Sequence, residues 1–220
     1  LYFMIGFPME TDEDVEAIGK LAQEIIGIGR RNNKRANLNL SVSTFIPKPH
    51  TPFQWYRQIS IEETERKQKI LRKEVRNRRI SFKPHDAYIS FLEGVFSRGD
   101  RRLGKVILQA YRLGCRFDAW TEQFKFEEWM EAFDKCNNDP EEYLRERVLD
   151  EPLPWEHIDT LVTKEFLLDE LKRSSNGELS LDCRKYGCNR CGINQYWADC
   201  VTKTAALSSQ IKDARNTVND

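Results

Sequence analysis

The order of elements in the first 45 residues constrains the fold of this chain more than any other feature. Residues 1–5 form a continuous apolar run that ends at Gly6, as expected for a strand buried on both faces. Thr11 and Asp14 have the spacing of a helix capping box, and apolar residues recur after them at helical intervals. A second strand-like segment covers residues 38–45. This order predicts a βαβ unit with parallel strands and a right-handed crossover.

Two parallel strands do not make a sheet by themselves, so we expect their neighbours to precede Leu1. The chain starts with leucine inside the apolar run, which indicates a piece of a longer protein. Gly27 and Gly29 are expected to end the first helix, and residues 30–35 are expected to form a basic loop. The sequence therefore predicts an α/β fragment whose sheet is completed by residues outside it.

Composition excludes several classes of protein. The chain has 220 residues, 40% of them hydrophobic and 32% charged, so it is long enough for a buried core and too apolar to be disordered. Its 35 basic residues balance its 35 acidic ones, which argues against a bulk electrostatic polymer binder. No apolar run approaches the length of a membrane span, and no signal peptide is recognisable. We therefore expect a cytoplasmic protein without membrane partners.

The sequence changes character after residue 56. A serine cap at Ser60 starts a helix that we expect to run to about Ile80, and further helical patterns follow. The expected helix carries a basic face made of Lys69, Arg72, Lys73, Arg76, Arg78, Arg79 and Lys83. This face could lie along RNA phosphates, although such a face is more often simply solvated.

Four cysteines near the C-terminus form the sharpest local pattern. Cys188 and Cys191 make a C-x-x-C pair flanked by glycines, and this spacing lets two thiolates face one metal ion from a tight turn. Cys183 lies within reach, and Cys200 is the obvious fourth ligand. Zinc and an iron–sulfur cluster both accept four thiolates, so both stay open. The alternatives are unrelated cysteines or a thiol–disulfide pair.

The other two cysteines fall within helical patterns. Six cysteines in a chain of this length are too few for a disulfide scaffold. Cys115 and Cys136 are isolated from the rest, and we expect them to be core residues.

Two turns after the expected strands could touch a ligand. Gly6 would let the backbone approach it, and Glu10 could accept hydrogen bonds from a ribose or an amine. Residues 45–52 form a proline-stiffened loop in which Phe45 could stack on an aromatic base. By spacing alone, an ordinary βα turn is the better explanation of the first segment, and a rigid exit from the sheet is an alternative for the second.

Together these segments resemble the radical S-adenosylmethionine (radical SAM) family. Residues 2–14, YFMIGFPMETDED, are similar to its late barrel strand and turn, commonly I-x-G-x-P-x-E-T. Residues 42–55, VSTFIPKPHTPFQW, are similar to the next strand and its exit, commonly P-x-P-G-T-P, with His50 in place of the glycine. One subgroup, the cobalamin-binding-domain radical SAM proteins of unassigned function, resembles the chain more widely. Its further matches are residues 90–93, 97–102, 117–120, 155–159 and 182–184.

The resemblance implies the C-terminal part of a longer enzyme, in which a [4Fe–4S] cluster reductively cleaves S-adenosylmethionine to a 5′-deoxyadenosyl radical. Carried over by position, Ile5, Gly6 and Glu10 would line the S-adenosylmethionine site, and the backbone near Phe45 and Ile46 would meet the adenine. The family's C-x3-C-x2-C cluster loop would lie upstream of this chain, as would a cobalamin domain. The chain alone would then be inactive, with the rest of the barrel as its partner.

The cysteine-rich segment is not equated with that cluster loop, because its spacing is C-x4-C-x2-C and it follows the barrel strands. The chain is thus expected to hold the last βαβ part of a partial TIM-like radical SAM barrel at residues 1–56. A mainly α-helical extension at 57–175, a Cys-rich metal-binding knuckle at 176–200 and a flexible tail at 201–220 follow. The alternatives are an RNA-binding or substrate-binding module of an RNA-modifying enzyme, and a structural zinc-binding domain.

Overall fold

The computed structural model of the chain describes residues 1–197 and residue 200. It is a mixed α/β structure with a small parallel sheet and several helices, as the sequence predicts at this coarse level. The strands are β1 (Tyr2–Ile5), β2 (Leu38–Thr44) and β3 (Ile80–Pro84). The helices are α1 (Asp12–Asn32), α2 (Ile61–Glu74), α3 (Ala87–Arg98), α4 (Leu103–Arg112), α5 (Phe126–Lys135), α6 (Glu141–Leu144), α7 (Lys164–Ser175) and α8 (Cys183–Tyr186), followed by the 3-10 turn η1 (Ile193–Gln195).

The first helix begins as predicted and ends later than predicted. The Thr11 hydroxyl accepts a hydrogen bond from the Asp14 N–H group, and the Asp14 carboxylate accepts one from the Thr11 N–H group, which completes the capping box. α1 then continues through Gly27 and Gly29 to Asn32. A helical glycine costs only about 1 kcal/mol relative to alanine, and packing of the apolar face outweighs that cost.

The expected basic helix from Ser60 to Ile80 is wrong in its last six residues, 75–80. α2 ends at Glu74, and the chain turns into a third strand, β3, that pairs in parallel with β2. The alternation of Ile80 and Phe82 with polar residues is the strand signal, and the surrounding charges obscure it. The sheet therefore has the order β1-β2-β3, with every pair parallel.

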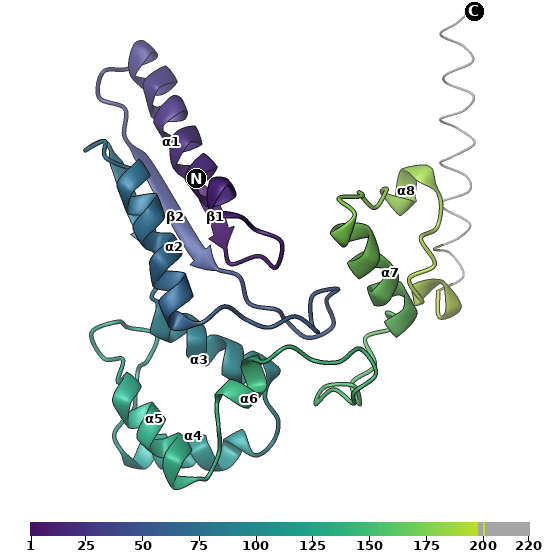
Figure 1. Ribbon diagram of the computed structural model, residues 1–220. Coiled ribbons are helices and arrows are strands. Elements are labelled where there is room, and N and C mark those ends of the chain that lie inside the picture. The colour runs from purple at the N-terminus through teal and green to yellow at the C-terminus, as the bar shows by residue number, and fades with distance from the viewer. Residues whose placement is uncertain (198–199, 201–220) are drawn as a thin grey trace, which may run out of the picture. The chain divides into compact units, whose positions relative to one another are not determined.

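The helices α1 and α2 cover one face of this sheet (Figure 1). They form one core with the strands, made of Ile5, Val15, Ala22, Ile26, Leu40, Val42, Leu71 and Ile80. Within the first 155 residues, several side chains on the opposite face of the sheet are exposed. Tyr2 and Met4 of β1 are 90% and 56% exposed there, and Ser43 of β2 is also exposed. In residues 1–155, α1 and α2 thus pack on one face of a sheet whose strand order follows the chain order.

A second core holds the helical part together. It consists of Phe91, Leu92, Val95, Leu103, Val106, Ala110, Cys115, Trp129, Ala132, Phe133, Tyr143 and Leu144. Beside it, the fully buried guanidinium of Arg98 donates to the backbone carbonyls of Pro47, Tyr143 and Arg145 at 2.8–3.0 Å. Arg98 thereby joins α3 to the segment after β2 and to α6.

The chain divides into two compact units. The first comprises residues 1–49 and 55–155, with the sheet and α1–α6. The second comprises residues 50–54 and the described residues from 156 onward, with α7, α8 and η1. The flexible tail expected at residues 201–220 lies outside the described residues. Within residues 1–197 and 200, no helix has the length and apolarity needed to cross a membrane.

Candidate functional site

The turn after β1 is built around a buried carboxylate. Gly6 has a φ of +90°, which favours glycine, and its N–H group donates to Oε1 of Glu10 at 2.9 Å. The same oxygen lies 2.9 Å from Nζ of Lys67 on α2. The side chains of Glu10 and Lys67 are only 8% and 4% exposed. Glu10 thus holds the turn and α2 together, and its expected contact with a ligand stays a prediction.

The structure brings the remaining residues of the expected S-adenosylmethionine site to the same end of the sheet. Phe45 N–H donates to the carbonyl of Ile5 at 2.8 Å, so the ends of β1 and β2 adjoin. The side chains of Ile5 and Ile46 are buried, so only their backbones could meet a ligand. His50 has a φ of +57°, the left-handed conformation that favours glycine in the resembling motif.

An aromatic pair forms the apolar part of this edge. The rings of Phe7 and Phe45 lie 4.5 Å apart between centroids and are tilted by 53°. Both side chains are half-buried, so part of each ring faces outward. Such a pair offers a surface on which a flat heteroaromatic ring could stack.

The backbone of the C-x-x-C segment turns tightly around its first cysteine. The N–H group of Arg190 donates to Sγ of Cys188 at 3.4 Å. Arg190 and Gly192 both have positive φ, +55° and +109°, which curl the chain around Cys188 and Cys191. The turn is anchored to α7, because Thr163 N–H donates to the Cys191 carbonyl at 2.9 Å.

The other knuckle cysteines stand near this turn. Cys183 opens α8, where the Asp182 carboxylate caps the helix by accepting from Arg184 N–H. Burial first, and then the thiols of the other three knuckle cysteines, raise the pKa of Cys200, so all four are within electrostatic reach. Among the described residues, no three Cys, His, Asp or Glu side chains converge closely enough to hold a metal ion. The ligand set Cys183, Cys188, Cys191 and Cys200 therefore stays a prediction.

The expected RNA-binding face is not one helix. Its basic residues are spread over α2, the following turn and β3. Arg72 lies over the Phe82 ring at 5.4 Å, and Lys69 faces Glu65 at 3.8 Å. RNA binding by this face stays a prediction, with a different geometry from the one expected.

The two isolated cysteines are core residues, as expected. Cys115 is 5% exposed within the second core, and Cys136 packs against that core from its edge. Burial raises the pKa of the Cys115 thiol to about 11, so it is neutral at pH 7.

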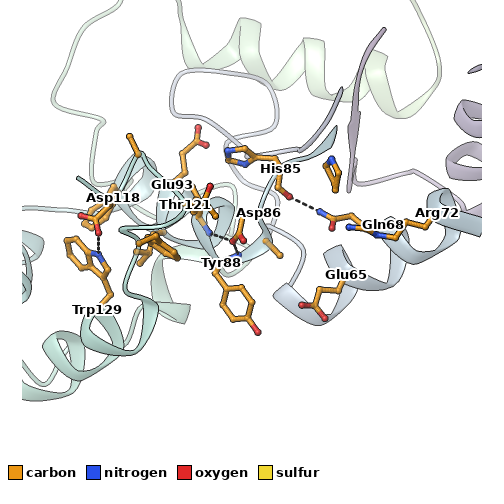
Figure 2. A pocket seen from close by; sticks show the side chains of 17 residues that line it. Glu65, Gln68, Arg72, His85, Asp86, Tyr88, Glu93, Asp118, Thr121 and Trp129 are labelled. Atoms are coloured by element: carbon orange, nitrogen blue, oxygen red, sulfur yellow. Dashed lines mark hydrogen bonds between the residues drawn. The ribbon is translucent and has the colours of Figure 1, made fainter. Parts of the chain in front are cut away.

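The structure contains a hollow at the carboxyl end of β3 that the sequence analysis does not predict. It has a volume of about 810 Å³ and lies between α2, α3 and the segment from Asp118 to Trp129. Figure 2 shows Asp118 bonded to the Trp129 indole on one side and Gln68 bonded to the His85 carbonyl on the other. The signal for it in the sequence is His85-Asp86 directly after β3, a strand that the sequence analysis does not predict.

Comparisons with known proteins leave the function open. No family model matches the chain, and no solved structure matches it. A stretch of 112 residues, 49% of the chain, is 31% identical to the uncharacterized protein MJ0966 of Methanocaldococcus jannaschii. This match covers 22% of that protein, so the chain spans well under half the length of this relative.

Proposed function

We propose that this chain is the last βαβ part of a radical S-adenosylmethionine barrel with a helical extension, and that it supplies one side of the S-adenosylmethionine site. The observation that carries the proposal is the sheet itself. Its strands are parallel and sequential, α1 and α2 cover one face, and side chains of β1 on the other face are exposed in the described part of the chain. In a TIM-like barrel the helices lie outside, and the opposite face of the sheet lines the interior.

The residues at the carboxyl ends of β1 and β2 fit a nucleoside ligand. Phe7 and Phe45 would stack with the adenine, because their rings are half-buried at the edge where parallel strands bind ligands. Gly6 would keep the backbone free of a side chain, and the Glu10–Lys67 pair would fix the turn. The bound cofactors would supply a 5′-deoxyadenosyl radical, with the cluster held by cysteines outside this chain.

The test uses the product of the complete gene, purified without oxygen. We expect iron, sulfide and the formation of 5′-deoxyadenosine from S-adenosylmethionine after reduction with dithionite. Phe45→Ala should weaken S-adenosylmethionine binding by about tenfold, because a buried stacking partner is lost. Phe117→Ala, which removes a ring that is 68% exposed on the loop between α4 and α5, is the matched control and should leave binding unchanged. Protein without iron and without cleavage would refute the proposal.

We also infer that the cysteine-rich knuckle binds a metal, as a second and separable function. The hydrogen bond from Arg190 N–H to Cys188 Sγ supports this, because a cysteine sulfur that binds a metal is commonly oriented by such outer hydrogen bonds. The positive φ angles of Arg190 and Gly192 support it as well. Thiolates suit both zinc and iron–sulfur clusters, so the ligand type alone does not choose between them.

Metal analysis of the 220-residue chain decides the second proposal. Colourless protein with one zinc per chain would indicate a structural site, and brown protein with iron would indicate an auxiliary cluster. Cys188→Ser and Cys191→Ser should abolish the metal content. Cys136→Ser is the control, because that cysteine packs against the second core and lies outside the knuckle. The metal content of this variant should be unchanged. Equal metal content in all variants would rule out the knuckle as the metal-binding site.

A further inference from the structure

The hollow at the carboxyl end of β3 has walls of exposed aromatic rings. Tyr88 and Phe96, both on α3, are 38% and 37% exposed, and both line it. Their positions are held by other rings, since Phe96 lies edge-on to Trp129 at 5.2 Å and Tyr88 edge-on to Phe126 at 4.7 Å. Rings held in this way can contact a ligand with a smaller further loss of side-chain entropy.

His85 at the edge of the hollow is held by a serine hydroxyl. The Ser90 hydroxyl donates to the carbonyl of Asp86 at 2.9 Å. Nδ1 of His85 lies 2.9 Å from the same hydroxyl oxygen. Because the His85 side chain is exposed, its ring can contact a ligand in the hollow.

The charge of the lining is negative. Its residues include four carboxylates, from Glu65, Asp86, Glu93 and Asp118, against one guanidinium. Glu93 is paired with Lys48 at 2.6 Å, and Glu65 is paired with Lys69 at 3.8 Å. Asp86 and Asp118 instead accept from neutral N–H groups, the helix amides of Tyr88 and Ile89 and the Trp129 indole, which leave their charge in place. Figure 2 shows both carboxylates at the hollow.

We propose that this hollow binds a small organic ammonium ion with an apolar body. The ammonium group would face the carboxylates of Asp86 and Asp118, with the exposed imidazole of His85 at the edge of the same hollow. The apolar body would lie on the faces of Tyr88 and Phe96, where a cation is also attracted to the ring. An anion of the same shape would be repelled by the lining. This site does not depend on the proposed radical chemistry.

Three probes of one shape test the proposal on the isotope-labelled 220-residue chain. 2-Phenylethylamine, 2-phenylethanol and phenylacetate differ mainly in charge, and the indole N–H signal of Trp129 reports on the hollow. We expect the amine to shift that signal and to bind at least about tenfold more tightly than the alcohol, with no saturable shift from the acid. Equal binding of all three probes, or saturable binding of none, overturns the proposal without any variant.

Two variants then test whether the carboxylates of Asp118 and Asp86 bind the ammonium group. Asp118→Asn keeps an acceptor for the Trp129 indole, and Asp86→Asn keeps a good helix cap, so both should fold. Each should weaken amine binding by about tenfold and leave binding of the alcohol unchanged. Glu122→Gln removes an exposed carboxylate that does not line the hollow, and it should change neither. Loss of amine affinity in Glu122→Gln equal to that in the other two would refute a site in the hollow.

Discussion

Nζ of Lys67 lies 2.9 Å from Oε1 of Glu10, and both side chains are almost fully buried. The pair joins α2 to the turn after β1, where Glu10 also accepts from the N–H group of Gly6. A buried ion pair contributes little net stability by itself, but removal of one partner leaves an uncompensated charge. The position of the turn at the proposed ligand edge therefore depends on a residue from a later helix.

Lys67→Met should lower the free energy of unfolding by about 3–5 kcal/mol, because it leaves the Glu10 carboxylate buried without a cation. The double variant Lys67→Met with Glu10→Gln should lose less than the sum of the two single losses, since it leaves no buried charge. Urea unfolding of Lys67→Met, Glu10→Gln and the double variant measures these losses. Lys69→Met is the control, because Lys69 is 71% exposed in its ion pair, and it should change stability by less than about 1 kcal/mol. Additive losses in the double variant would contradict a coupled pair.

Arg98→Lys should also destabilise the chain, by about 2–4 kcal/mol, although the charge is kept. An ammonium group does not reproduce the planar fork that reaches the carbonyls of Pro47, Tyr143 and Arg145. Arg101→Lys, at an exposed neighbouring position, should be neutral. Equal urea midpoints for the two variants would mean that the carbonyl contacts of Arg98 contribute nothing measurable.

The elements with strong local signals could be predicted from the sequence. The Thr11–Asp14 capping box and the apolar run of β1 depend only on neighbouring residues, and both are found where expected. β3 was missed because Ile80 and Phe82 follow a run of basic residues that continues the helical pattern. Its strand character comes from pairing with β2, which is a contact far apart in the sequence.

Some parts of the candidate site could likewise be predicted from the sequence, and other parts could not. The residues at the ends of β1 and β2 were predicted, because parallel strands bring their carboxyl ends together. The partnership of Glu10 with Lys67 was not, since 57 positions separate them and Lys67 resembles its solvated neighbours on a basic helix. The hollow beside His85 was also missed, because it is formed by packing between three segments.

Stability should fall at high pH because of Cys115. Burial raises the pKa of its thiol from 9.0 to about 11, so the folded state favours the neutral form. This contribution is fully present below pH 9 and is lost as the pH rises through about 11. Relative to Cys115→Ala, the wild-type chain should lose about 2 kcal/mol between pH 8 and pH 11. Urea unfolding at both pH values measures the difference, and parallel pH profiles would contradict it.

Gly192→Ala should loosen the junction between the knuckle and α7 more than Gly187→Ala does. Both glycines have a φ near +110°, which L side chains rarely adopt, so each substitution strains the backbone. The two substitutions differ in the room around the added methyl group. A Cβ atom at Gly192 would lie 2.6 Å from the Leu161 carbonyl oxygen and 2.8 Å from Cγ2 of Thr163, whereas one at Gly187 would meet nothing within 4 Å.

Amide hydrogen exchange at Thr163 reads out this difference, because that N–H group donates to the Cys191 carbonyl across the junction. We expect Thr163 to exchange at least about tenfold faster in Gly192→Ala than in Gly187→Ala, since only the first pushes the two backbones apart. If the clash also separates the knuckle from α7, Gly192→Ala should bind metal more weakly than Gly187→Ala. Equal exchange in both variants would mean that the close approach at Gly192 does not hold the knuckle in place.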